Sequence, residues 1–261
     1  MFNRESLLEP FAGEDREIAA RILDLAELAY KYNRPEHGDF LDPHGQKVAL
    51  EVVRWLKGFI FRLNGGYKTA ERKRLSLIPD YFFADDTDSP VVALQVEGDF
   101  RFTKAAHRDV LGSLMSLGLR REKVGDILPV QEGCQILLAA EIADFVETNL
   151  TRIKGVPVEA KSIELEQLAV EPEQVKPIRA TVASLRLDAV AAAGYGLSRS
   201  KMAVEIKGQK VRLNWQPVSN PALPVKKGDV LSIRGRGRVV IEDILGTTRK
   251  GRQSILLVRY R

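Results

Sequence analysis

The net charge of this chain changes sign near residue 175, and that change constrains how the chain can be divided into domains. Residues 176–261 hold 18 Lys and Arg against 5 Asp and Glu, a net charge of +13. Residues 1–175 hold 22 basic and 30 acidic residues, a net charge of −8. The acidic, proline-containing stretch Glu171–Pro177 lies where the sign changes. Such stretches separate compact units, so we expect a linker at residues 171–180 and a basic domain at residues 181–261.

The positive charge of the C-terminal part favours a polyanionic partner. A compact domain with such an excess attracts nucleic acid, because each phosphate contact releases condensed counterions. A surface that serves only solubility mixes its charges more evenly. A basic surface without a ligand is the alternative.

Composition and length exclude several other classes of protein. The 261 residues, of which 44% are hydrophobic, suffice for about two globular domains. No apolar run approaches the roughly 20 residues that span a bilayer, and the first residues do not form a secretory signal. The single cysteine, Cys134, excludes an internal disulfide framework, and its apolar neighbours favour a packed thiol over a nucleophile. We therefore expect a cytoplasmic protein.

Residues 1–80 are expected to form a helical α/β domain. Apolar residues with a helical period predict helices over residues 16–32 and 46–57. A strand at Phe59–Leu63 follows, and Gly65–Gly66 marks the turn after it.

Residues 81–170 predict the order β-α-β-β-α-β of a ferredoxin-like plait, which RNA-recognition-motif (RRM) domains also use. The segments are, in order, Val91–Val96, Lys104–Leu117, Val124–Leu128, Gln135–Ala139, Glu141–Asn149 and Val156–Leu165. The aromatic residues with which RRM strands stack bases are missing from these strands. We interpret this domain as a scaffold or protein-contact domain first, and we expect an α+β protein in three parts.

The basic domain contains residues suited to holding a phosphate. Ser198 is placed to cap a helix, and Arg199 and Lys201 fall in its first turn. Cations there oppose the helix dipole unless an anion binds beside them. Helix-end amides together with Arg and Lys would form a phosphate cradle. In the following strand, Lys210 and Arg212 share one face.

Four motif pieces resemble the small RNA-binding domain named after ribosomal protein S-four. They are Arg186–Asp188, Ser198–Lys201, Lys207–Asn214 and Lys227–Asp229. The resemblance covers about residues 181–238 and implies binding of structured RNA through two helices and the turn and strand after them. Carried over by position, the RNA-binding residues are Arg186, Ser198, Arg199, Lys201, Lys207, Lys210, Arg212 and Asn214. Trp215 stands where the family often has glycine, so the chain departs from the family pattern at this turn.

An arginine-rich turn extends this surface. We add Arg234, Arg236 and Arg238 to the RNA-binding set because of their alternation with glycine. The alternative is a solvated hairpin tip. In the same way, the pairs Arg186–Asp188 and Lys201–Glu205 could be ordinary surface ion pairs, which contribute about 0–1 kcal/mol each.

The front of the chain adds five stretches to this resemblance, namely Asp39–Pro43, Gly65–Tyr67, Ala70–Arg74, His107–Leu114 and Arg121–Ile127. With them, the chain is similar to the bacterial YlmH family, and within it to the branch called photosystem II S-four-domain proteins. The resemblance implies a ribosome-associated protein that binds ribosomal RNA and transfer RNA on the large ribosomal subunit. It links the chain to translation or to the rescue of stalled ribosomes. The photosystem branch implies another role, which no residue here supports chemically.

Other candidate sites leave alternatives open. The basic residues Arg72, Lys73, Arg74, Arg121 and Lys123 either add accessory RNA contacts or form solvated surfaces. A metal at Asp39, Asp42 and His44 is disfavoured, because this stretch has the character of a loop that opens a helix. No catalytic triad, acid–base pair or phosphate-binding loop is visible. The hypothesis is thus an RNA-binding protein without catalytic activity, metal or cofactor. An RNA-modifying enzyme and a photosystem assembly factor are the alternatives.

Overall fold

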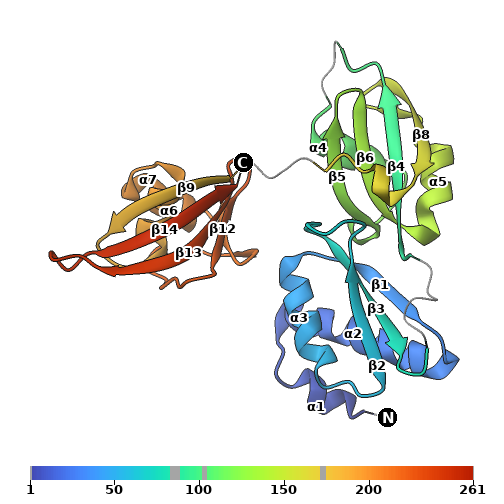
Figure 1. Cartoon of the computed structure of the whole chain (residues 1–261), viewed down its shortest axis with the longest axis horizontal. Coiled ribbons are helices and arrows are strands. Elements are labelled where there is room, and N and C mark those ends of the chain that lie inside the picture. The colour runs from blue at the N-terminus through green and yellow to red at the C-terminus, as the bar shows by residue number, and fades with distance from the viewer. Residues whose placement is uncertain (1, 83–88, 102–104, 171–174, 261) are drawn as a thin grey trace. The chain divides into compact units, whose positions relative to one another are not determined.

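The computed structural model describes residues 2–82, 89–101, 105–170 and 175–260. It divides into two compact units, Met1–Val170 and Glu171–Arg261 (Figure 1). Helices and antiparallel sheets make up both units, so the expected α+β class is confirmed. Within the described ranges, no helix combines the length and the apolar character needed to cross a membrane.

The first unit begins with a three-stranded antiparallel sheet packed against helices. Its elements are α1 (Arg4–Leu8), α2 (Gly13–Tyr32), β1 (Glu36–Leu41), α3 (Pro43–Val53), β2 (Phe59–Asn64) and β3 (Lys73–Pro79), and its strand order is β1-β3-β2. The core joins apolar residues of both long helices to β3, for example Ile22, Val52 and Leu77. This core forms because the apolar stripe of each helix needs a buried surface to face.

Helix α3 starts and ends earlier than the expected range of residues 46–57. The carboxylate of Asp42 accepts a hydrogen bond from the backbone N–H of Gly45 at 2.8 Å, and Pro43 occupies the first turn. This cap starts the helix, because a carboxylate satisfies an amide that has no partner within the helix. His44 Nε2 lies 2.7 Å from Asp15 Oδ1. Asp42 and His44 of the metal hypothesis are thus engaged within the protein, and its third member, Asp39, pairs with Lys123. The described residues contain no metal-binding group of three His, Cys, Asp or Glu.

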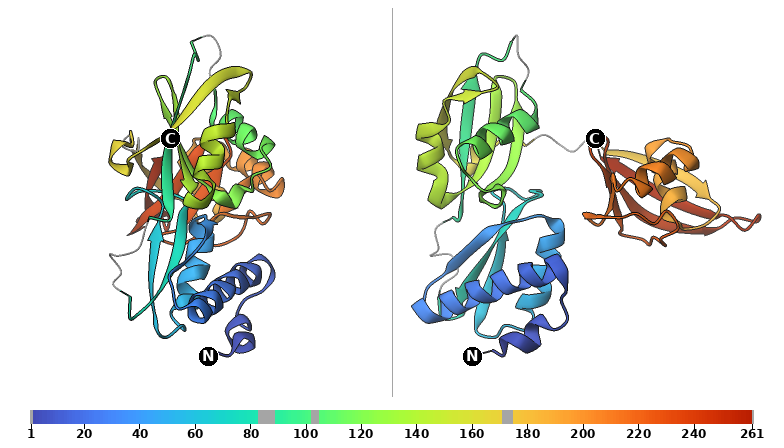
Figure 2. Two further views of the ribbon diagram at one scale, coloured as in Figure 1. Left: turned by 90° about the vertical axis from the view of Figure 1, so that its right-hand side faces the viewer. Right: turned by 180° about the vertical axis from the view of Figure 1, so that it is seen from behind.

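The rest of the first unit is the expected plait. Its elements are β4 (Val91–Gly98), α4 (His107–Ser116), β5 (Val124–Val130), β6 (Gly133–Ala139), α5 (Ala143–Asn149), β7 (Arg152–Ile153) and β8 (Val156–Ile163). The strand order is β5-β6-β4-β8-β7, with every neighbouring pair antiparallel. The β-α-β-β-α-β order is confirmed. Helices α4 and α5 cover one face of this sheet (Figure 2). The first residue of the expected helix over Lys104–Leu117 lies outside the described residues.

The other face of the plait sheet is covered in part. Ala93 and Leu137 on this face are fully buried, and Phe40 from β1 packs against them with only 2% of its surface exposed. Tyr67, Leu165 and Leu168 add to the same cluster. An RRM domain stacks RNA bases on the equivalent face. In this chain the part of that face around Ala93 and Leu137 is filled by the N-terminal domain and by the segment that follows β8, whereas Glu159 and Lys161 on β8, which lie on the same face, are exposed.

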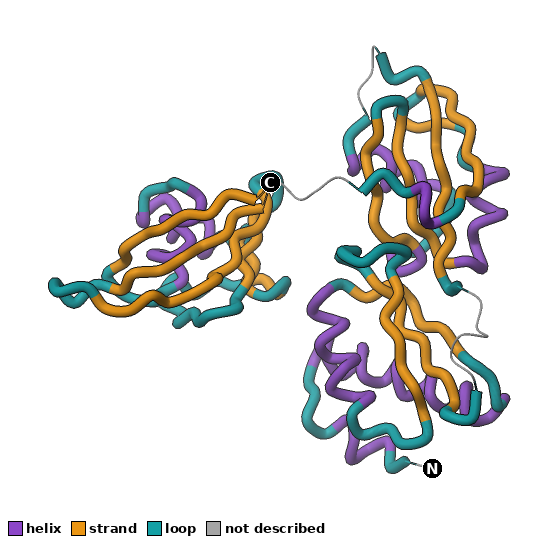
Figure 3. Tube along the Cα trace, in the orientation of Figure 1, coloured by secondary structure: helices purple, strands orange, loops and turns teal. Residues whose placement is uncertain are grey.

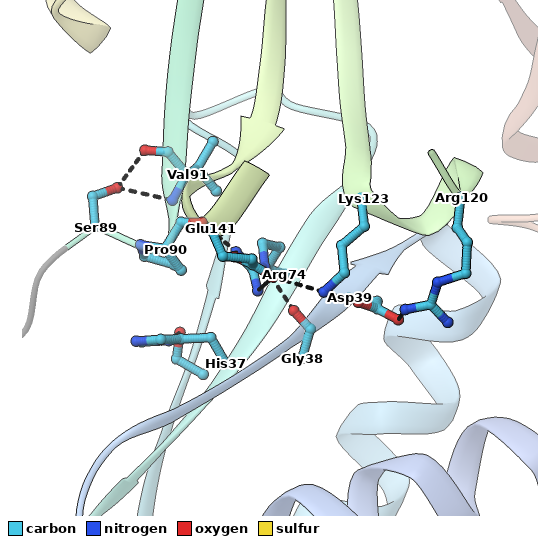
Figure 4. Close-up of polar contacts among 11 residues, drawn as sticks. His37, Gly38, Asp39, Arg74, Ser89, Pro90, Val91, Arg120, Lys123 and Glu141 are labelled. Atoms are coloured by element: carbon cyan, nitrogen blue, oxygen red, sulfur yellow. Dashed lines mark hydrogen bonds and ion pairs between the residues drawn. The ribbon is translucent and has the colours of Figure 1, made fainter. Parts of the chain in front are cut away.

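Polar contacts join the two parts of the first unit beside this apolar cluster (Figure 4). Arg74 on β3 is 1% exposed, and its guanidinium donates to the carboxylate of Glu141 at 2.8 and 3.0 Å. It also donates to the carbonyl oxygens of Gly38 and Pro90. Lys123 lies 2.6 Å from Glu141 and 2.7 Å from Asp39. Each of the three nitrogens of the buried Arg74 guanidinium thus has an acceptor, as a charge taken out of water requires.

The second unit is a six-stranded antiparallel sheet with two helices on one face (Figure 3). Its elements are β9 (Val175–Val182), α6 (Leu187–Tyr195), α7 (Arg199–Lys207), β10 (Val211–Leu213), β11 (Gln216–Pro217), β12 (Val230–Ile233), β13 (Gly237–Thr247) and β14 (Gln253–Tyr260). The strand order is β11-β10-β12-β13-β14-β9. Residues 175–180, which we expected in a linker, are therefore part of a strand. They pair with β14, whose N–H and C=O groups would otherwise lack partners along that edge.

The strand register defines two ends of this sheet. At one end, Thr247 pairs with Gln253, and Gln253 pairs with Val182. At the other end, Arg238 pairs with Tyr260. The turn at residues 234–236 lies beyond that second end, since Ile233 pairs with Gly237.

Candidate nucleic-acid interface

A buried aspartate holds two arginines together at the start of helix α6. Asp188 is 5% exposed, and its carboxylate lies 3.2 Å from Nη2 of Arg186 and 3.0 Å from Nε of Arg199. The side chains of the two arginines keep 42% and 49% of their surface exposed. The aspartate therefore orients both guanidinium groups while leaving part of each free to meet a ligand.

The protonation of Asp188 supports this arrangement. Burial by itself would raise the pKa of Asp188, but hydrogen bonds from Arg199 and Arg186 outweigh burial and lower it. The carboxylate therefore stays charged at neutral pH. Two cations against one anion leave a net positive charge at this point of the surface, and guanidinium groups match phosphate oxygens in geometry.

Helix α7 begins as the sequence predicts. The hydroxyl oxygen of Ser198 accepts a hydrogen bond from the backbone N–H of Lys201 at 3.3 Å, so Ser198 is the cap. Arg199 and Lys201 lie exposed in the first turn. Lys207 is exposed at the opposite end, where the helix dipole favours a cation. The hydroxyl of Ser198 is committed to the helix, while Lys201 projects to solvent.

Asn214 serves the turn after β10. Its amide oxygen accepts from the N–H of Val230 at 3.0 Å, and its amide nitrogen donates to the buried Asp229, also at 3.0 Å. Asn214 and Trp215 have φ angles of 51° and 69°, so both residues of this hairpin loop are left-handed. A two-residue loop of this kind matches the twist of its strands, and Asn is among the residues that tolerate it. The tryptophan thus adopts the conformation that glycine takes more easily.

The remaining basic residues of the expected set lie in a different part of the unit. By register, Arg212 pairs with Ser232 and Ser232 pairs with Arg238, so these three side chains share one face of the sheet. The buried Val211 and Ile233 point to the opposite face, where the helices pack. Arg238 lies over the ring of Tyr260 at 4.6 Å, and Arg234 and Arg236 are exposed in the adjoining turn.

The structure thus brings the expected residues into two groups. Arg186, Arg199 and Lys201 form the helix-side group, which we name the α6–α7 patch. The second group has two parts. On the sheet face opposite the helices lie Arg212 and Arg238, and in the adjoining turn at residues 234–236, which we name the arginine turn, lie Arg234 and Arg236. Lys210 pairs with Glu205 at 3.3 Å, and its side chain is mostly exposed.

Most of the expected accessory residues in the first unit serve its internal packing. Arg74 is buried in the contacts described above, so it has no surface to offer an RNA phosphate. Arg72 donates to the carbonyl oxygens of Val124 and Phe40 at 3.1 and 2.9 Å, and Arg121 donates to that of Val124. Burial lowers the pKa of Arg72, and burial together with the nearby Arg72 lowers the pKa of Arg121 to about 10.

Two lysines complete the accessory set. Lys123 is 21% exposed and bridges two carboxylates. Lys73 is half-buried and reaches only the carbonyl of Lys68, at 3.5 Å. Of the accessory set, Lys73 is thus the residue least involved in internal contacts.

Sequence reasoning missed two kinds of residue. The first is Asp188, which the sequence presents only as a possible surface partner of Arg186. The Arg-x-Asp spacing does not reveal that the aspartate is buried and positions two arginines. The cations Arg249, Lys250 and Arg252 entered the charge count but were not assigned to a site. The signal that could have found them is a basic run around Gly251 between two alternating apolar strands.

Comparison with known families covers most of the chain. The N-terminal domain of YlmH matches residues 14–82, the putative RNA-binding domain in YlmH matches residues 85–167, and the S4 domain matches residues 185–231. The "Ribosome-associated protein quality control protein P2" of Bacillus subtilis is 34% identical over 255 residues, which cover 98% of this chain and 99% of that protein. The chain belongs to the YlmH family.

A solved structure agrees in fold. The "Cell division protein ylmH from Streptococcus pneumoniae" is 23% identical, with a TM-score of 0.52 over 62% of this chain and 97% of that one. The S4 (S-four) match includes the α6–α7 patch but ends at residue 231. The arginine turn and the β13–β14 hairpin therefore lie beyond the S4 match, although the Bacillus subtilis relative matches 98% of the chain.

Proposed function

We propose that this YlmH-family chain is a non-catalytic protein that binds structured ribosomal or transfer RNA on the large ribosomal subunit, in translation or in the rescue of stalled ribosomes. The observation that carries the proposal is the pair of half-exposed arginines that buried Asp188 holds in place. Fixed guanidinium groups lose little entropy when they bind a phosphate. The name of the Bacillus subtilis relative supports the ribosome as the place of action.

The α6–α7 patch supplies phosphate contacts, and the shape of the RNA supplies selectivity in this proposal. The first unit acts as a scaffold. The sheet face that binds RNA in an RRM is partly covered here, because the N-terminal domain and the segment after β8 pack on Ala93 and Leu137. We propose that RNA affinity therefore depends on the second unit, at residues 181–261.

The test is the salt dependence of RNA binding by the full chain. Arg199→Ala with Lys201→Ala should weaken binding to bulk transfer RNA and lower the slope of log K against log salt by about one to two units, at roughly 0.7–0.9 per lost phosphate contact. Lys176→Ala with Arg179→Ala removes the same charge from exposed positions of β9 and is the matched control. An unchanged slope in the first variant would place the RNA surface elsewhere.

Two further measurements separate the alternatives. Ultraviolet crosslinking of the tagged chain in its native cells, followed by sequencing of the attached RNA, should enrich large-subunit ribosomal RNA and transfer RNA. A photosystem assembly factor would show little salt-sensitive RNA affinity in the titration. An RNA-modifying enzyme would change nucleosides in an RNA digest, and any such turnover would refute the non-catalytic proposal.

A further inference from the structure

The hairpin between β13 and β14 is a basic projection of the second unit (Figure 1). Its tip, residues 248–252, carries Arg249, Lys250 and Arg252. No Asp or Glu occurs between Asp243 and Arg252, so neither the tip nor the four residues before it carry an acidic side chain. Among the described residues, neither Arg249 nor Lys250 forms an ion pair, and both are exposed.

The tip is held in one conformation by its own hydrogen bonds. The N–H of Thr248 donates to the carbonyl of Arg252 at 2.7 Å, and the N–H of Gly251 donates to the carbonyl of Thr248 at 2.9 Å. The hydroxyl oxygen of Thr248 accepts from the N–H of Arg252 at 3.1 Å. Gly251 has a φ of 73°, which glycine adopts without strain. The backbone that carries Arg249 and Lys250 is thus ordered before any ligand binds.

The tip also lies at the same end of the sheet as the start of α6. The guanidinium of Arg252 donates to the carbonyl of Thr181 on β9 at 2.8 Å. Only four residues lie between Thr181 and Arg186, the first arginine of the α6–α7 patch. The arginine turn lies at the opposite end of β13, about 30 Å away at roughly 3.3 Å per residue.

We infer that the β13–β14 hairpin tip is a second phosphate-binding site, at which Arg249 and Lys250 contact the backbone of the same structured RNA that the α6–α7 patch binds. This inference rests on the proposed function. A short tip without aromatic side chains has no surface on which to stack a base, whereas two exposed cations on an ordered turn suit phosphate oxygens. Two separated contacts also fix the orientation of an RNA helix, which one patch cannot do.

The first test is a salt titration with bulk transfer RNA and the full chain. Arg249→Ala with Lys250→Ala should lower the salt slope by about 1.4–1.8 units, because each contact contributes roughly 0.7–0.9. With equal affinities at 1 M salt, this lower slope means that the variant binds the RNA about 25- to 60-fold more weakly than the parent chain at 0.1 M salt. The Lys176→Ala, Arg179→Ala control should stay within about twofold of the parent chain, since screening removes most of its influence at a distance.

The second test locates the tip on the RNA. Cys134 is buried, and burial raises its pKa to about 12, so a cysteine introduced at Lys250 is the reactive thiol of the variant. An iron–EDTA group tethered at Lys250→Cys should cut the RNA at a cluster of positions. The same group at Ser200→Cys, an exposed position in α7, should cut a second cluster on the same molecule.

The outcomes separate this inference from the proposed function. If the parent chain shows no salt-dependent RNA binding, the proposed function itself fails. If the parent chain binds but the Arg249→Ala, Lys250→Ala variant keeps its slope, the hairpin site is refuted and the α6–α7 patch stands. Cutting from Ser200→Cys without cutting from Lys250→Cys leads to the same conclusion.

Discussion

Replacing Arg74 should destabilise the first unit without changing RNA binding. Arg74→Met keeps an apolar stem of similar length but removes the guanidinium. The carbonyl oxygens of Gly38 and Pro90 then lose a donor, and Glu141 keeps Lys123 as a partner. Breaking a buried ion pair costs about 3–5 kcal/mol, and we expect the lower value because the Glu141 side chain is 46% exposed.

The change can be measured by calorimetry of the full chain. For a unit of about 170 residues, 1 kcal/mol corresponds to roughly 2–4 °C, so the transition of the first unit should fall by about 6–12 °C. The transition of the second unit should not move. Lys73→Met, at the neighbouring half-buried position, is the matched control and should shift neither transition by more than about 2 °C.

The result also decides between two interpretations of the basic run at residues 72–74. If Arg74 contacts RNA, the Arg74→Met variant will bind transfer RNA with a lower salt slope at a temperature where it is folded. If Arg74 only joins the two parts of the first unit, the slope will equal that of the parent chain. A melting temperature within about 2 °C of the parent would refute the reasoning from burial.

Three further predictions concern other positions. Asp188→Asn removes a negative charge but also removes the carboxylate that orients two arginines, so transfer RNA binding should weaken by about fivefold at 0.1 M salt, as for one lost phosphate contact. Tighter binding would mean that net charge alone matters. Gly125→Ala places a Cβ 2.7 Å from the Phe40 ring and should lower the free energy of unfolding by about 1–3 kcal/mol in urea, whereas Gly112→Ala, with open space around it, should not. Burial would raise the pKa of Glu141, but hydrogen bonds from Lys123 and Arg74 lower it to about 2, so its contribution to stability is present above about pH 4.5 and is lost as the pH falls toward 2. The difference in unfolding free energy between the parent chain and Glu141→Gln should therefore shrink over that range, and a constant difference would contradict the assignment.

Local patterns in the sequence were sufficient for most elements of the fold. The order of the plait, the Ser198 cap and the alternation along β10 were all predicted, because each depends on residues close together in the chain. The bounds of α3 were wrong, since the strength of the cap at Asp42 was not recognised. The sequence predicts a linker at residues 175–180, whereas the structure has them in β9. The local sequence does not reveal this strand, because its pairing partner, β14, lies about 80 residues further along the chain.

The sequence by itself determined the boundary between an acidic front and a basic C-terminal unit, the class of each part and the residues of the α6–α7 patch. Charge, period and motif spacing are properties of the chain that no packing can alter. Only the tertiary structure decided which charges are available to a ligand. Arg72, Lys73 and Arg74 are adjacent and look alike in the sequence, yet Arg74 is buried beside Glu141 while Lys73 is half-exposed. The reason is physical: exposure depends on contacts with Gly38, Pro90 and Glu141, which come from three distant segments and meet only when the chain has folded.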